Sequence, residues 1–578
     1  MKLVKYFRNM LSNLYLSIKR FPFTILLSVS ILALLISIHE LSPIENTLSR
    51  IAMVLSLGIP LSLFIKLFFE KRNEENTYKL FIGYGASALL LVLYYLFLLP
   101  NAMGMVPTTR YIAVNLALYM GFLFIPYFPE KPDFEMYVIV LVSAFFTTLL
   151  YSVVLYAGLS AILFSIDKLL GIKVLGKVYY YTWLFVVFIF AVSYFLSVIP
   201  LKDSKLTLKS YPKLLRILIL YIVMPLLTAY TIILYIYFGK IIVTVTWPIG
   251  LVSHLVLWYS VIVTIALFFI TPIKDESSWA NKFLKLAPKI LLPLIVMMFI
   301  SMGIRINAYG ITEPRYFVVI LGLWIFSVMI YFSFSKKLRN ILIPVSLAFI
   351  TLISVFGPVS SYSLSKYSQR HRFEKILMQN NMLTDGNINT SKNVSKEDKA
   401  NISSILSYFH RNHSYKDLKH LPENFKLKDM DKVFGFSYEG PFNESPDQYF
   451  YIRSRSQGVL DIKGYDYIFD MNGLYDRDIL SFKDIDAIYD LGSSTIKMTY
   501  LGNEIYKKNL EDFANNLVSK YNTSDKEIRV PENEMAFIEE NDKIKVKIVF
   551  QHISGSKNDS IGEINSKGFE FYLLVKVK

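Results

Sequence analysis

Three charged residues lie close together between two apolar stretches past the middle of the chain. They are Arg305, Glu313 and Arg315, all within eleven residues. Two guanidinium groups offer paired donors that suit a phosphate or a carboxylate, which makes these residues a candidate anion or headgroup site. A purely structural interpretation is also open. Thr312 or Glu313 caps the following helix, Pro314 occupies its first turn, and the carboxylate pairs with an arginine.

Other residues with chemical potential are weaker candidates. Glu40 and Glu45 lie between two early apolar stretches, where a transferase acting on a lipid-linked substrate would need an acidic residue. His254 lies just inside a later apolar stretch. Ion-coupled carriers usually embed carboxylates near the middle of the membrane, and no Asp or Glu falls in the middle of the stretches assigned below. These patterns identify no catalytic residue.

Metal and cofactor motifs are weak in this sequence. His371, His410, His413 and His420 match no zinc spacing, and the chain has no cysteine. The acidic run from Asp461 to Asp490 lacks the positions of a calcium loop and is typical of a solvated face. We therefore expect neither a metal nor a cofactor.

The elements that must position these residues are long apolar helices. The mean hydropathy is +0.42, higher than a soluble domain usually reaches. Apolar windows predict about eleven membrane spans, because a spanning helix needs roughly 20 apolar residues. The predicted spans are 21–39, 51–69, 80–100, 111–127, 137–164, 178–199, 214–238, 250–272, 287–304, 316–334 and 341–360.

The net charge of +16 is unevenly distributed. Residues 1–360 contain 30 Lys and Arg against 13 Asp and Glu, whereas residues 361–578 contain 31 against 32. The excess sits in short connections, which excludes a basic nucleic-acid module. With the N-terminus in the cytoplasm, the inner connections and adjoining helix ends hold 22 basic residues and the outer ones 8. An odd number of spans then places the C-terminal domain outside the cytoplasmic membrane, and one miscounted span would place it inside.

Three segments carry a family resemblance. They are Trp247–Ser253, Tyr309–Tyr316, and Phe356–Ser360 with the downstream residues Ser365, Ser368 and Gln369. Together they resemble the bacterial multi-pass membrane family catalogued as domain of unknown function 4153. The resemblance implies a bacterial membrane protein with a C-terminal appendage. It supplies no catalytic residues.

The composition changes once, near residue 360. We predict a transmembrane helical domain at 1–362, an amphipathic helix and polar linker at 363–400, and an extracytoplasmic α+β domain at 401–578. Ser395 and Asp398 suit a capping box at the start of a helix. Period-two patterns then predict strands at 449–455, 459–461, 495–501, 504–506, 535–540, 544–552 and 569–577, with a helix at 510–521.

The predicted fold is thus a polytopic helical bundle followed by a small strand-rich domain. We expect a bacterial cell-envelope protein that senses or binds a partner through its outer domain. That partner is an envelope protein, a lipid or a glycan, in addition to the lipid bilayer itself. A transporter or lipid flippase, and a membrane-embedded transferase, remain as alternatives.

Overall fold

The computed structural model describes most of the chain. The described residues are 15–40, 45–72, 77–100, 103–129, 132–201, 204, 206–207, 211–244, 251–384, 386–391, 393–438, 447–455, 460–472, 479–490, 493–521, 527–558 and 564–578. They form two compact units. The first comprises Met1–Ile376 with Phe409–Lys419, and the second comprises Leu377–Tyr408 with His420–Lys578.

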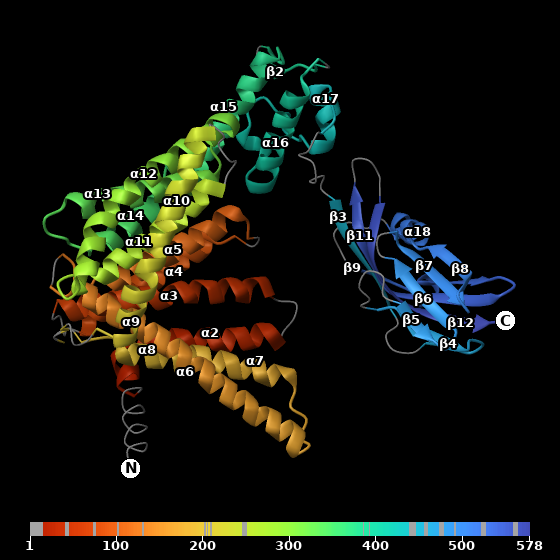
Figure 1. Cartoon of the computed structure of the whole chain (residues 1–578), viewed down its shortest axis with the longest axis horizontal. Helices are drawn as coiled ribbons and strands as arrows, with labels where there is room; N and C mark the ends of the chain where they lie inside the picture. Colours follow the sequence, from red (N-terminus) through yellow and green to blue (C-terminus); the bar gives the residue numbers. More distant parts are fainter. Residues whose placement is uncertain are drawn as a thin grey trace. The chain divides into compact units, whose positions relative to one another are not determined.

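The first unit is a bundle of apolar helices (Figure 1). Their bounds are α2 (Pro22–Glu40), α3 (Glu45–Lys71), α4 (Thr77–Leu98), α5 (Met105–Phe124), α6 (Phe134–Leu169), α7 (Gly176–Phe185), η1 (Val186–Ala191), α8 (Val192–Val198), α9 (Lys213–Ile217), η3 (Leu218–Val223), α10 (Met224–Thr244), α11 (Leu251–Ile270), η4 (Thr271–Ile273), α12 (Ser278–Tyr309), α13 (Glu313–Phe334) and α14 (Leu342–Val355).

The predicted helical bundle and its strand-rich appendage are confirmed. Within the described ranges, nine helices are long and apolar enough to cross a membrane, and α7–α8 and α9–α10 each count as one of them. The two remaining predicted spans correspond to α5 and α14. Helix α5 carries Arg110 and Asn115, and α14 has only 14 residues.

A large buried cluster joins α10, α11, α12 and α13. Leu267, Ile325 and Met329 are fully buried in it. Gly322 on α13 allows a close approach to α12, because a Cβ at this position would lie 2.5 Å from the Cε atom of Met298. The cluster therefore holds in place the helices that carry Arg305 and Arg315.

Two membrane helices contain π-helical turns, at Val186–Ala191 and Leu218–Val223. Such turns interrupt the regular hydrogen-bond ladder and often occur at functional sites. Pro225 follows the second turn at the start of α10 and removes a further backbone donor. Helix α10 thus begins at a locally weakened point.

Shorter helices follow the bundle. They are α15 (Ser361–Gln379), α16 (Lys396–Asn412), η5 (Tyr415–Asp417), η6 (Leu427–Asp429) and α17 (Met430–Phe434). One half of the predicted capping box of α16 is confirmed, because the Ser395 hydroxyl accepts a hydrogen bond from the backbone N–H of Asp398 at 3.1 Å; the Asp398 carboxylate accepts from the side-chain amide of Asn380 at 3.1 Å. The range predicted as a polar linker contains the start of α16 and an antiparallel pair, β1 (Leu383–Thr384) with β2 (Asn387–Ile388).

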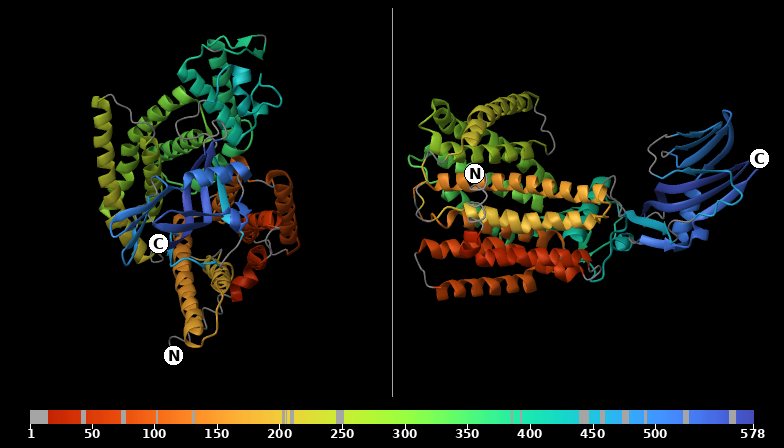
Figure 2. Two further views of the ribbon diagram at one scale, coloured as in Figure 1. Left: turned by 90° about the vertical axis from the view of Figure 1, so that its right-hand side faces the viewer. Right: turned by 90° about the horizontal axis from the view of Figure 1, so that it is seen from below.

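The C-terminal residues form two sheets and one helix around a common core (Figures 1 and 2). One sheet has the order β4-β12-β11-β3-β9, with β10 also paired to β11, and the other has the order β5-β6-β7-β8. The bounds are β3 (Asp447–Ser454), β4 (Tyr467–Asp470), β5 (Ile479–Phe482), β6 (Ile485–Asp490), β7 (Thr495–Tyr500), β8 (Asn503–Asn509), α18 (Glu511–Tyr521), β9 (Glu527–Val530), η7 (Glu532–Glu534), β10 (Ala536–Glu540), β11 (Ile544–Asn558) and β12 (Ile564–Val577).

Most predicted strands of this domain, and its helix, are confirmed. The strand predicted at 459–461 is wrong for Leu460 and Asp461, which lie in no strand, and Val459 falls outside the described residues. Strands β4, β5, β6 and β9 were not predicted. In β6, side chains alternate between buried and partly exposed positions. Acidic residues occupy two of the partly exposed positions, so the sequence there resembled a wholly solvated segment.

Candidate anion site and apolar groove

The connection between α12 and α13 is a tight hairpin built on Gly310. This glycine has a φ of 71°, a conformation that side chains with a Cβ rarely adopt. Arg315 closes the hairpin: its Nη1 atom donates to the carbonyls of Tyr309 at 3.2 Å and Gly310 at 2.6 Å. Thr312 is the N-cap residue of α13, although its side chain makes no capping bond, and Pro314 lies in the first turn as predicted.

Helix α15 holds the hairpin from the other side. The buried side-chain amide of Gln369 donates to the carbonyls of Tyr309 at 3.0 Å and Ile311 at 2.9 Å. The hydroxyl of Ser368 accepts from the backbone N–H of Ile311 at 2.9 Å. These bonds satisfy backbone groups that the two helix ends leave without helical partners.

Three arginines surround this hairpin, and we call Arg305, Arg315 and Arg372 the arginine cluster. Arg372 Nη1 reaches the carbonyl of Tyr309 at 3.5 Å. Arg315 experiences the positive charges of both Arg305 and Arg372. Burial lowers the pKa of the Arg372 guanidinium, although an arginine remains charged at neutral pH. Three neighbouring cations of limited exposure create a local field that favours an anion.

Glu313 makes a close contact with a residue outside the cluster, and its predicted pairing with an arginine stays a prediction. Its carboxylate lies 2.6 Å from Nε2 of His413, and the two side chains are only 2% and 5% exposed. Asp417 pairs with Lys366 of α15 at 3.0 Å. The segment Phe409–Lys419 is therefore fixed to the start of α13 by a buried hydrogen bond and to α15 by an ion pair.

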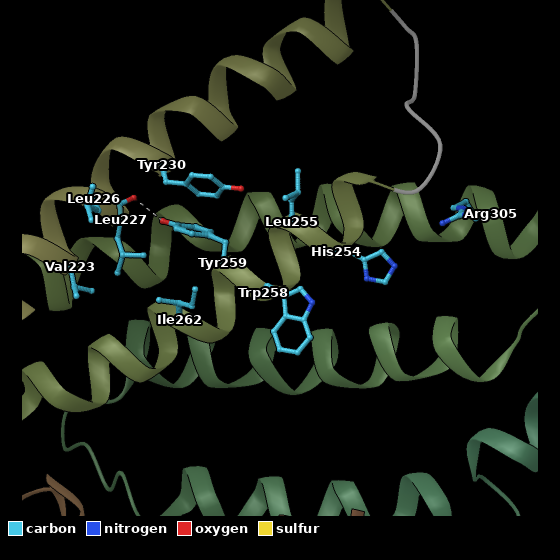
Figure 3. A pocket seen from close by; sticks show the side chains of 10 residues that line it. All are labelled: Val223, Leu226, Leu227, Tyr230, His254, Leu255, Trp258, Tyr259, Ile262 and Arg305. Carbon is cyan, nitrogen blue, oxygen red and sulfur yellow. Dashed lines mark hydrogen bonds between the residues drawn. The ribbon is translucent and has the colours of Figure 1, made fainter. Parts of the chain in front are cut away.

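An apolar groove of about 780 Å³ lies beside α10, α11 and α12, and we call it the Arg305 groove. Its walls are apolar and aromatic side chains, and its polar end is formed by His254 and Arg305 (Figure 3). The lining residues are Val223, Leu226, Leu227, Tyr230, His254, Leu255, Trp258, Tyr259, Ile262 and Arg305. The Nε atom of Arg305 is buried and has no hydrogen-bond partner among the described residues. One end of the groove can thus hold an anionic group and the remainder an apolar chain.

Comparison with known families identifies the bundle. The profile of the family described as domain of unknown function (DUF4153) matches residues 23–388, well over half of the chain. The chain belongs to the DUF4153 family. The match includes the arginine cluster, the hairpin and Gln369, whereas His413 lies beyond it.

Comparison with individual curated proteins gives a relative, the uncharacterized protein PM1469 of Pasteurella multocida (strain Pm70). This DUF4153 chain is 26% identical to it over 226 residues, which is 39% of the chain and 38% of the relative. The alignment thus spans well under half of the relative's length. No solved structure matches the chain.

The other predicted candidates of this DUF4153 protein lie in separate places. Glu40, at the end of α2, accepts hydrogen bonds from Lys177 Nζ at 2.8 Å and the Tyr181 hydroxyl at 2.5 Å. The side chain of Glu45, the first residue of α3, is not among those described. Of the two weaker candidates whose side chains are described, His254 lines the Arg305 groove and Glu40 does not.

The membership of Arg372 in the site was not predicted from the sequence. Neither was the contact between His413 and Glu313. Arg372 lies in a polar helix with many charges, and nothing in its spacing distinguishes it from solvated neighbours. His413 was considered only as a metal ligand. Among the described residues no group of three or more metal-ligating side chains is present. Instead His413 contacts Glu313, His410 stacks on Tyr415, and His420 Nδ1 contacts the Gly386 carbonyl.

Proposed function

We propose that the membrane domain binds an anionic amphiphile in the Arg305 groove, as part of a bacterial cell-envelope protein. One observation carries this proposal: the groove is apolar along its walls and ends at His254 and Arg305. Its volume of about 780 Å³ lies within the range of roughly 300–1,000 Å³ that small-molecule sites span. An amphiphile with one charged end matches a groove that has apolar walls and one polar end.

The headgroup decides which lipid binds. Moving an acyl chain from the bilayer into an apolar groove gains little hydrophobic free energy, because both surroundings are apolar. An anion beside Arg305 relieves the repulsion within the arginine cluster and gives the buried Nε atom a partner. We therefore expect selection for a phosphate or carboxylate headgroup, with weak discrimination between acyl chains.

Sidedness belongs to the proposal. The excess of Lys and Arg at one set of connections supports a cytoplasmic N-terminus. The arginine cluster and the C-terminal domain then lie on the extracytoplasmic side. This orientation would let the groove take its ligand from the outer leaflet, while the strand-rich domain binds an envelope protein, a lipid or a glycan.

The transferase alternative gains little from the geometry. A general base needs an available lone pair and a pKa near the working pH. The Oε1 atom of Glu40 already accepts bonds from Lys177 and Tyr181, which stabilise the charged carboxylate and make it a poor base. A transferase would have to use another carboxylate.

Quenching of Trp258 tests the proposal, because this side chain lines the groove and is 60% exposed. The full chain is placed in zwitterionic vesicles that contain a small fraction of a dibrominated anionic phospholipid. The difference between wild type and Trp258→Phe isolates the Trp258 signal. We expect that signal to be quenched more strongly by the brominated anionic lipid than by a brominated zwitterionic one.

Charge variants on α12 complete this experiment. Arg305→Gln should remove the preference for the anionic lipid. Lys285→Gln is the matched control, because it removes one exposed positive charge from the same helix without touching the groove. Equal quenching by both brominated lipids in the wild type would contradict the proposal.

A further inference from the structure

A second apolar cavity lies between the same three helices. It has a volume of about 450 Å³, and we call it the Lys282 groove. Thr231 and Tyr235 of α10, Tyr259 of α11, and Trp279, Lys282 and Leu286 of α12 are among its lining residues. The lining residues of α12 lie between positions 279 and 291, whereas Arg305 lines the first groove near the other end of this helix. The two grooves therefore use opposite halves of α12.

The spacing of the two basic residues matches the thickness of a bilayer. Lys282 and Arg305 are 23 residues apart on α12. At 1.5 Å per residue this corresponds to about 35 Å along the helix axis, slightly more than the roughly 30 Å of the hydrocarbon core. If α12 spans the bilayer along its axis, each groove has a cation at one membrane boundary, where a lipid headgroup lies.

Tyr259 is a lining residue of both grooves. Its hydroxyl is hydrogen-bonded to that of Thr231 and donates to the carbonyl of Leu227 at 3.2 Å. Tyr235, in the second groove, donates to the carbonyl of Ile290 at 2.7 Å. Polar groups in a membrane interior often mark the route of a polar substrate. Here hydroxyl groups lie at Tyr259, the one residue that the described linings of the two grooves share.

Helix α10 forms a wall of both grooves and begins at the π-helical turn Leu218–Val223, followed by Pro225. In Figure 3 it lies near α11 at Val223 and Leu227 and diverges from it further along. A helix with an interrupted ladder at one end bends there more readily than elsewhere. A small tilt of α10 would change the width of the passage at Tyr259.

We propose that the two grooves form one path along which a lipid with an anionic phosphate headgroup crosses the bilayer, with Tyr259 and Thr231 as its barrier. The headgroup passes from Arg305 to Lys282, and the acyl chain that the Arg305 groove holds in the bound state moves out into the surrounding lipid. Among the described residues that line the two grooves there is no Asp or Glu, and the proposed movement is therefore a passive one. This inference rests on the proposed function of the Arg305 groove and adds a second site and a direction of movement.

A leaflet-exchange assay tests the path. The full chain is reconstituted in vesicles with a trace of an anionic phospholipid labelled with NBD on its acyl chain, and dithionite is added outside. Movement across the bilayer exposes the inner-leaflet probe to reduction. We expect the wild type to make nearly all of the probe reducible, whereas protein-free vesicles protect the inner fraction.

Three variants on α12 show whether lipid exchange depends on the Lys282 groove, on the Arg305 groove, or on neither. Lys282→Gln should slow exchange by roughly tenfold, the effect of losing one charge-assisted contact, and leave Trp258 quenching unchanged. Arg305→Gln should reduce both exchange and quenching. Lys285→Gln, three residues from Lys282 and outside both grooves, should alter neither.

The outcomes separate the two proposals. Preferential quenching of Trp258 without lipid exchange would overturn the path and leave the binding function intact. Equal exchange rates in Lys282→Gln and Lys285→Gln would also overturn the path. Absence of preferential quenching would contradict the binding function itself.

Discussion

The carboxylate of Glu313 lies 2.6 Å from the imidazole of His413, 100 residues further along the chain. Both side chains are almost fully buried. Glu313 starts α13 next to the hairpin that Arg315 closes, and His413 begins the stretch after α16. One contact thus connects the candidate anion site to a segment that lies beyond the matched part of the family.

Loss of the His413 imidazole should destabilise the first unit. His413→Ala removes a hydrogen-bond partner from the buried Glu313 carboxylate, and the loss of one partner of a buried polar group typically costs about 1–3 kcal/mol. The melting temperature of the full chain in detergent should fall clearly. His410→Ala is the control, because His410 lies three residues before His413, in the last turn of α16, and is exposed. Melting temperatures that fall equally for both variants would contradict a specific role of the pair.

Gly310 should resist substitution, in contrast to Gly303. A Cβ at Gly310 would lie 2.7 Å from Nε2 of Gln369, on a backbone with a φ of 71°, so Gly310→Ala should cost about 1–3 kcal/mol. Gly303 lies inside α12 with nothing near its Cβ position, so Gly303→Ala should gain roughly 0.5–1 kcal/mol. Thermal unfolding of the two variants should shift in opposite directions.

Arg315 should distinguish a binding role from a structural one. Arg315→Lys keeps the charge but cannot reproduce the planar set of donors, so preferential quenching of Trp258 by the anionic lipid should weaken. Arg315→Ala should weaken it further. Both proteins should still insert into the membrane. Wild-type quenching in both variants would remove Arg315 from the site.

The C-terminal domain should lose stability in acid. Hydrogen bonds from Lys520 and Tyr521 lower the pKa of Glu534, and the contact with Lys578 lowers that of Glu540. A carboxyl group whose pKa is lower in the folded state binds fewer protons there than when unfolded. Its stabilisation is therefore present above the unfolded value of about 4.3 and is lost as the pH falls through the folded value.

Hydrogen exchange of peptides from β10 and β11 in the full chain measures this dependence. Exchange should accelerate as the pH is lowered beneath about 4.3, after correction for the intrinsic rate. Glu534→Gln should flatten the dependence, whereas Glu532→Gln, two residues away, should leave it in place. An unchanged profile in Glu534→Gln would show that this carboxylate is not responsible.

The spans were predictable because the bilayer interior rejects charge, so each long uncharged stretch had to become a helix. Strand β6 was not predictable, because the acidic residues Asp486 and Asp490 occupy partly exposed positions in it. They make the segment look wholly solvated in the sequence, although Ile485, Ala487 and Tyr489 are buried. Arg305 and Arg315 could be paired as candidates because they lie ten residues apart. Arg372 could not be added, nor could His413 be paired with Glu313, because only the tertiary fold brings these residues together.

A density map of the full chain in lipid nanodiscs containing anionic phospholipid tests the central claim most directly. The account predicts an elongated density along α11 in the Arg305 groove, with its headgroup between His254 and Arg305. Arg305→Gln should remove the headgroup density. A groove that remains without lipid density in the wild type, or lipid density there that is the same in Arg305→Gln, would contradict the account.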